Sequence, residues 1–352
     1  MLELPVYAYS LARHLHFGWQ FFAFDSLFRM MPGLKGPIRV QDPKVIKETH
    51  RAFLNLLRQD AKNISEGVYP IQVLKPESPF KHFKRFPLML LDSFEVYRRR
   101  AQGESSQFNS VAQGMLDEVP KYYRRNFHFQ TSGYLSKRSA ELYEHQVETL
   151  FAGSADAVRR QVLKPMKEHF RTPTGKGLKI LEIAAGTGRA TRFTSLTFPQ
   201  AQITAIDISD PYLQVARKNL ANLSRIDFLR TNAEELPFQD ETFDAVYSVF
   251  LFHELPYEAR KKVVKEARRV LKPGGFFGLV DSVQKGDSIT FESLLPSFPQ
   301  SYHEPFFMDY VSKPMDELLE KEKISNVKTG IGAFSKVMWG TKPGVTRLKN
   351  SN

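Results

Sequence analysis

The chain has 352 residues, 42% of them hydrophobic, and a formal net charge of +12 at pH 7. This length suits one large domain or two ordinary ones, and the apolar share is enough for a sizeable core. The chain contains no cysteine, which excludes disulfides, thiolate nucleophiles and cysteine-ligated metals. It also has no run of about 18 uncharged apolar residues that would indicate a membrane-spanning helix.

The first 140 residues are predicted to be a mainly helical domain that caps a pocket or docks onto a partner. Asp42 is a good N-cap with Pro43 at the first helical position, and an apolar stripe continues to about residue 64. A second helix is predicted over 87–100. Most of the positive excess lies in this half of the chain, and it is compatible with nucleic acid, an anionic membrane surface or an acidic substrate, or with a plain basic surface.

The next segment, 141–175, is predicted to lead into a second domain over 176–345. Its helical pattern over 136–170 is interrupted near Gly153, and the turn-forming residues RTPTGKG at 171–177 form the clearest linker. After this linker, short apolar runs alternate with amphipathic helical patterns, which favours βαβ units and a parallel sheet.

The stretch ILEIAAGTGRAT at 180–191 is typical of a strand, a tight turn and the start of a helix. Gly186 and Gly188 allow a sharp turn and a close approach to a ligand, and the carboxyl end of such a strand is where ligands bind in parallel sheets. A third glycine is missing at Thr191, which argues against a dinucleotide. Glu182, just before the turn, suits a cationic amino-acid group instead.

Further polar residues follow the next predicted strands. Asp207 ends the second strand, at the spacing where an acid holds ribose hydroxyls, and Asn232 follows the third, placed to bind a base. Phe250 and His253 follow the fourth strand, at the floor of the expected pocket. A ligand with an adenosine and a positively charged methionine tail, S-adenosylmethionine (SAM), fits both acids.

Residues 176–285 resemble the class I SAM-dependent methyltransferases, in particular the group of ubiquinone and menaquinone biosynthesis. EIAAGTG at 182–188 matches the glycine motif of that class with Ala184 in place of the first glycine, and NAEELPF at 232–238 matches a second motif with Asn232 for an Asp. FDAVYSVFLFH at 243–253 and LKPGG at 271–275 match two more. The resemblance implies a Rossmann-like α/β fold with a seven-stranded sheet whose last strand, at about 333–341, is antiparallel.

The predicted cofactor contacts follow from these motifs and from the resemblance. They are Glu182, Ala184, Gly186, Thr187, Gly188, Asp207, Ile208, Asn232, Ala233 and Phe250, together with Tyr143 on the helix that precedes the core.

The acceptor is expected to be a small hydrophobic or aromatic molecule, with a quinone-like ring as the class that the resemblance implies. His253 is the candidate base, because it follows the fourth strand on the substrate side. Four residues of the segment 301–310 are predicted to contact the acceptor: Tyr302, His303, Phe306 and Tyr310. His303 and Glu304 lack the spacing of helical metal ligands, so no metal site is predicted.

Two other functions stay open on the sequence. The chain could methylate RNA or protein and dock through its basic domain, where YYRRNFHFQTSGYLS at 122–136 interleaves aromatic and basic residues; the same segment could instead line a lid, and nucleic acid is not expected. It could also be a non-catalytic SAM-binding protein. The N-terminus lacks the pattern of a secretory signal, so a cytoplasmic location is expected, with a peripheral membrane contact left open.

Overall fold

The computed structural model describes residues 2–75 and 79–344. The helices of the first half are α1 (Glu3–Arg29), α2 (Pro43–Ser65), α3 (Pro79–Gln102), α4 (Ser110–Gly114), α5 (Lys137–Leu150), α6 (Ala155–Arg159) and α7 (Leu163–Phe170). Those of the second half are α8 (Arg189–Thr197), α9 (Asp210–Asn219), α10 (Tyr257–Val270), α11 (Ile289–Glu292), α12 (Ser297–Tyr302), α13 (Phe307–Ser312) and α14 (Met315–Lys321).

A single seven-stranded sheet lies at the centre, in the order β3-β2-β1-β4-β5-β7-β6. Its strands are β1 (Lys179–Ile183), β2 (Gln202–Asp207), β3 (Ile226–Arg230), β4 (Phe243–Val249), β5 (Leu271–Ser282), β6 (Ser325–Gly332) and β7 (Ser335–Thr341). The first five strands run parallel, and β7 is antiparallel to both β5 and β6. The predicted Rossmann-like sheet with a reversed last strand is therefore confirmed.

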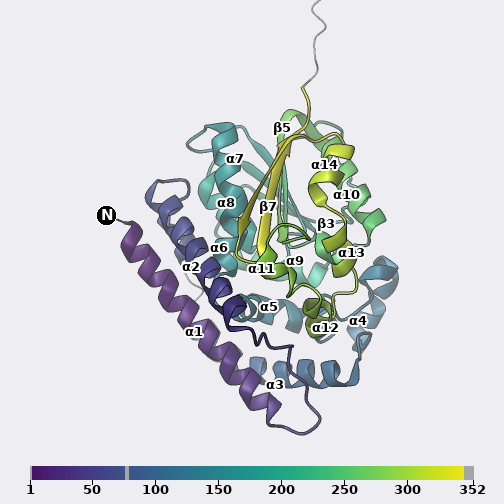
Figure 1. The fold of residues 1–352 in the computed structure, drawn as a ribbon. Coiled ribbons are helices and arrows are strands. Elements are labelled where there is room, and N and C mark those ends of the chain that lie inside the picture. The colour runs from purple at the N-terminus through teal and green to yellow at the C-terminus, as the bar shows by residue number, and fades with distance from the viewer. Residues whose placement is uncertain (1, 76–78, 345–352) are drawn as a thin grey trace, which may run out of the picture.

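Side chains alternate across this sheet and build a core on each face. Along β1, Ile180 packs into a core on the side of α7 and α8, whereas Leu181 and Ile183 pack into a core on the side of α10 and α14. The first core also contains Val6 of α1 and Phe53 of α2, so the N-terminal helices extend the helical layer on that face (Figure 1). The domain limits predicted at 140 and 175 stay a prediction.

Several local predictions are confirmed. The Asp42 side chain accepts from the Lys44 amide at the start of α2, and Gly153 adopts a φ of 77° between α5 and α6. Helix α10 ends at Val270, and the following LKPGG segment is already the extended start of β5.

Helix α1 was not singled out by the sequence because it is apolar on both sides. Its inward face buries Val6, Phe17 and Phe28, while Trp19 is 70% exposed on the opposite face. A helix without a polar face gives no amphipathic signal. The described helices include none that is long and apolar enough to cross a membrane.

Candidate cofactor and active site

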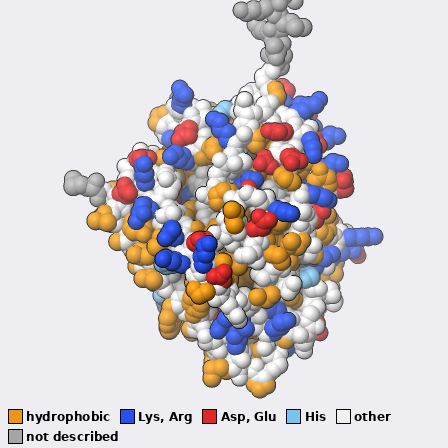
Figure 2. Space-filling view, in the orientation of Figure 1, with side chains coloured by type: hydrophobic (Ala, Val, Ile, Leu, Met, Phe, Trp, Pro, Cys, Tyr) orange, Lys and Arg blue, Asp and Glu red, His pale blue; other side chains and the backbone are white. Residues whose placement is uncertain are grey.

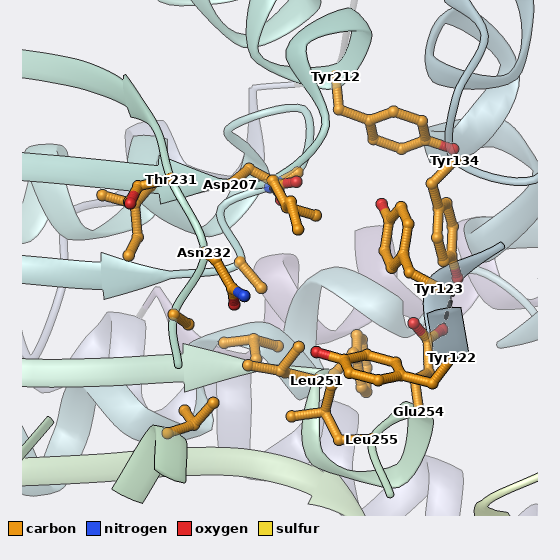
Figure 3. Close-up of a pocket in the computed structure, with 18 of the residues that line it drawn as sticks. Tyr122, Tyr123, Tyr134, Asp207, Tyr212, Thr231, Asn232, Leu251, Glu254 and Leu255 are labelled. Carbon is orange, nitrogen blue, oxygen red and sulfur yellow. Dashed lines mark hydrogen bonds between the residues drawn. The ribbon is translucent and has the colours of Figure 1, made fainter. Parts of the chain in front are cut away.

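A cavity of about 110 Å³ lies at the carboxyl ends of the first four strands. The segments after these strands supply its wall on the sheet side, with Gly186 after β1, Asp207 and Ile208 after β2, Asn232 after β3 and Phe250 after β4. The strand order reverses between β1 and β4, and ligands of open parallel sheets bind at such a point. Figure 3 shows Asp207 and Asn232 on this side of the cavity.

Asp207 is held by the turn that follows β1. Its Oδ2 accepts from the Gly186 amide at 2.8 Å and its Oδ1 accepts from the Ser209 amide at 2.8 Å. Burial raises the pKa of the Asp207 carboxyl to about 6, although these backbone amides act in the opposite direction. A carboxylate in this position can accept hydrogen bonds from two neighbouring hydroxyls of a ligand.

Ala184 occupies a conformation that favours glycine. Its φ is 59°, in the left-handed region where an L side chain costs about 1–2 kcal/mol, and it lines the cavity. The substitution that distinguishes this chain from the glycine motif therefore lies at the wall of the cavity.

Three predicted cofactor residues do not line this cavity. The Glu182 carboxylate is buried and accepts from the Tyr247 hydroxyl at 2.7 Å, and burial raises its pKa to about 7. Thr187 donates its hydroxyl proton to Glu144 of α5. Gly188 lies against α9, where an added Cβ would come within 2.8 Å of Leu220. In the structure these three residues brace the turn, while the other predicted cofactor residues line the cavity.

The opposite wall of the cavity is built from tyrosines. Tyr122, Tyr123 and Tyr134 come from the segment before α5 and Tyr212 from α9 (Figure 3). Tyr143 of α5 also lines this cavity. Tyr134 stands edge-on to both Tyr143 and Tyr212. Of these five tyrosines, only Tyr143 was predicted to contact the cofactor. Three others belong to the aromatic segment 122–136, which the sequence singled out. In the structure these three side chains cover the cavity.

A second, larger cavity of about 230 Å³ adjoins the first. Tyr143, Phe250 and Glu254 line both cavities and form the wall between them. The remaining lining is mainly apolar and comes from distant parts of the chain, including Ile38, Val147, Leu295, Phe298 and Phe334.

His253 lines this second cavity and pairs with a buried acid. Its Nδ1 lies 2.5 Å from Asp281 Oδ1 at the end of β5, and the residue is 6% exposed. Burial lowers the pKa of His253, but the Asp281 carboxylate outweighs this and raises the pKa to about 10. Asp281 holds Nδ1, and Nε2 lies 4.0 Å from a Glu254 oxygen.

The four predicted acceptor residues are placed differently from one another. Tyr302 lines the second cavity. His303, Phe306 and Tyr310 do not, because His303 packs on Phe129, Phe306 packs on Tyr122, and the buried Tyr310 hydroxyl donates to the Ser282 carbonyl. The sequence did not indicate the other residues of the cavity wall. They come mostly from α5, from the segment 294–301 and from the segment 38–40, which meet only in the fold.

Residues 180–275, which contain almost all of the first four strands and the turns around the first cavity, match the family profile described as a methyltransferase domain. The chain is 39% identical over 104 residues to a ubiquinone/menaquinone biosynthesis C-methyltransferase of Pasteurella multocida, covering 28% of this chain and 38% of that protein. It is 29% identical over 156 residues to a phthiotriol/phenolphthiotriol dimycocerosates methyltransferase of Mycobacterium tuberculosis, covering 44% and 51%. The matches therefore span about half or less of these curated relatives.

Among solved structures, a SAM-dependent methyltransferase from Aquifex aeolicus is 19% identical with a TM-score of 0.39, covering 52% of this chain and 89% of that one. The predicted resemblance to class I SAM-dependent methyltransferases is confirmed by the family profile and the curated relatives.

Proposed function

We propose that the chain transfers a methyl group from SAM to a small apolar or aromatic acceptor, a quinone-like ring being the leading class. The observation that carries this proposal is the pair of adjoining cavities, one with a nucleoside-type wall and one mainly apolar. The names of the ubiquinone/menaquinone and phthiotriol relatives support an apolar acceptor.

The residues of the first cavity fit this cofactor. Asp207 offers a carboxylate for the ribose diol, and Asn232 offers an amide for the base. The rings of Tyr134 and Tyr143 give the sulfonium an aromatic surface, which attracts cations. When bound, SAM supplies an electrophilic methyl group, and its sulfur keeps the electron pair of the broken carbon–sulfur bond.

The protein's own contribution is to align the acceptor and to handle its proton. The wall shared by the two cavities separates the cofactor from the acceptor, so the methyl group would pass beside Phe250 and Glu254. Proximity in such a site is the main source of rate. His253 was predicted as the base, but with its pKa raised to about 10 by Asp281 it is protonated at neutral pH. It would therefore stabilise the oxygen anion of an ionised acceptor by hydrogen bonding and charge.

The test is binding followed by transfer. Calorimetric titration of the chain with SAM, compared with NAD, examines the cofactor. Transfer of a labelled methyl group into a lipid extract, compared with RNA and protein fractions, examines the acceptor. Label in RNA or protein but not in lipid would contradict the apolar acceptor, and SAM binding without label in any fraction would favour a non-catalytic protein.

The structure places the aromatic residues of segment 122–136 mainly against the cofactor cavity. Tyr122, Tyr123 and Tyr134 line that cavity, so these rings are not an exposed platform on which bases could stack. This placement argues against the use of these three rings as a stacking surface for nucleic acid.

The outer face of α1 supports a contact between the protein and a membrane surface. Leu4, Leu15, Trp19, Phe22 and Met30 are exposed and share one side of the helix, and Figure 2 shows hydrophobic side chains along the lower-left edge, where α1 runs in Figure 1. An aromatic apolar helix face on a protein of net charge +12 suits an anionic bilayer surface.

Two residues of the second cavity lie close to α1 in the sequence. Ile38 and Val40, in the connection from α1 to α2, are exposed and also line the second cavity. We propose that α1 lies on a membrane and that an apolar acceptor enters beside these residues.

Replacing Trp19 and Phe22 by serine is expected to abolish binding to vesicles of phosphatidylcholine with a minority of phosphatidylglycerol. Each substitution removes a large exposed ring that would enter the bilayer interface. Vesicle flotation measures this, and Ile289→Ser is the matched control because Ile289 is 94% exposed on α11, away from α1. Equal flotation of all variants would contradict membrane binding through this face.

Replacing Ala184 by leucine is expected to weaken SAM binding at least about tenfold, since roughly 1.4 kcal/mol corresponds to a factor of ten. The larger side chain would fill the cavity and strain a backbone at a φ of 59°. Ala184→Gly is the control, because glycine adopts this conformation freely and should bind SAM as the parent chain does. Normal SAM binding by the leucine variant would show that this turn does not approach the cofactor.

A further inference from the structure

A cluster of two acids and a histidine lies beside the wall between the two cavities. His128 belongs to a short 3-10 turn at 127–129, Glu254 to another at 252–254, and Glu304 to the connection between α12 and α13. His128 Nε2 lies 3.0 Å from a Glu304 oxygen and 3.6 Å from a Glu254 oxygen, and one ligand atom from each residue lies within 4.8 Å of the others.

Glu304 is the member of the cluster that ordinary packing does not explain. It is 1% exposed, and within the described residues neither of its carboxylate oxygens accepts a hydrogen bond of good geometry, although Oε1 faces His128. A buried carboxylate without such bonds is costly unless it is paired or coordinates a metal.

The charges around this cluster are also unbalanced. Glu254, Glu304 and Asp281 bring three carboxylates into one buried region, and in the described part of the chain their ion pairs involve only His128 and His253, with no Lys or Arg. A divalent cation would supply the missing positive charge between Glu254 and Glu304.

We propose that His128, Glu254 and Glu304 bind a divalent metal ion at the junction of the cofactor and acceptor cavities. Ligand atoms bound to one ion at about 2.0–2.2 Å lie roughly 3–4 Å apart, which the distances to His128 Nε2 match. One imidazole and two carboxylates suit Mn²⁺, Fe²⁺ or Zn²⁺. The Tyr134 hydroxyl donates to Glu254 at 2.5 Å and fixes that ligand.

The position of the ion suggests its use. Three protein ligands leave coordination positions open, and His128 and Glu254 both line the acceptor cavity. An oxygen of the acceptor can occupy an open position, where the ion polarises it and orients the ring toward the methyl group. This role rests on the proposed methyl transfer, whereas the binding of the ion does not.

The experiment is a titration of the chelator-treated full chain with Mn²⁺, followed by electron paramagnetic resonance. One bound ion per chain is expected, with coupling to one histidine nitrogen and with displacement by Zn²⁺. Glu304→Gln and His128→Gln should each weaken the site at least about tenfold, and His128→Gln should also remove the nitrogen coupling.

Glu148→Gln is the matched control, since Glu148 is a buried acid of the Arg13 and Arg159 ion pairs, outside the cluster. It should bind Mn²⁺ as the parent chain does. If Glu304→Gln does not fold, His128→Gln alone decides, because its side chain is 19% exposed.

Absence of stoichiometric Mn²⁺ and Zn²⁺ binding, or unchanged affinity and nitrogen coupling in His128→Gln, would overturn the metal site. SAM titration of the same samples separates the two proposals. Intact SAM binding without metal binding removes only the metal, and metal binding without SAM binding removes only the proposed function.

Discussion

Replacing His253 by alanine is expected to lower kcat about 10²- to 10⁴-fold, the usual contribution of a positioned acid or base. The imidazole lines the acceptor cavity and is fixed by Asp281 at 2.5 Å. It does not line the cofactor cavity, so the affinity for SAM should stay unchanged. Turnover of the labelled acceptor fraction, together with calorimetric SAM binding, checks both parts.

The same substitution is expected to destabilise the fold, which must be separated from the loss of chemistry. Removing one partner of a buried ion pair costs about 3–5 kcal/mol, because the other charge is left uncompensated. The double variant His253→Ala with Asp281→Asn removes both charges and should recover much of the free energy of unfolding without recovering turnover. Near-normal turnover in either variant would leave proximity alone as the source of the rate.

The cofactor side of the site could be predicted because each of its parts is local. A strand, a turn with Gly186 and an acid at the next strand end are short motifs, and the parallel sheet brings successive strand ends together without further information. Asp207 and Asn232 therefore lie where the sequence places them. Ala184 also lies where the motif predicts it, because its φ of 59° is a conformation that the glycine of the motif would adopt.

The acceptor side could not be predicted because its residues meet only through tertiary packing. Ile38, Tyr143 and Phe334 line one cavity but lie far apart in the sequence. Glu182 illustrates a related difficulty. It precedes the glycine turn as a ligand-binding acid would, yet it accepts from Tyr247, 65 residues away. Spacing alone does not distinguish a residue that contacts a ligand from one that braces its neighbours.

The same reasoning applies to the proposed metal ligands. His128, Glu254 and Glu304 come from three separate segments, and spacing rules for metal sites address ligands within one segment. The neighbours His303 and Glu304 lack the spacing of helical metal ligands, and in the structure His303 packs on Phe129. Helix α1 was missed for a different reason, because its exposed face is as apolar as its buried one.

Replacing Asp207 by alanine is expected to weaken SAM binding on the order of a hundredfold or more. Two hydrogen bonds from ribose hydroxyls to a charged acceptor would be lost, each worth about 1.5–3 kcal/mol. Calorimetric titration measures the loss. Asp227→Ala is the matched control, because Asp227 is an exposed acid on the neighbouring strand β3 and does not line the cavity.

Asp207→Asn separates the charge from the support that Asp207 gives to the turn. The amide keeps an oxygen that can accept from the Gly186 amide, so this variant should bind SAM more tightly than the alanine variant and more weakly than the parent chain. Because burial raises the pKa of the Asp207 carboxyl to about 6, protonation below that pH replaces an acceptor by a donor. The affinity of the parent chain for SAM should therefore fall as the pH is lowered through about 6, whereas that of Asp207→Asn should not. An equal pH dependence in both would show that another group controls cofactor binding.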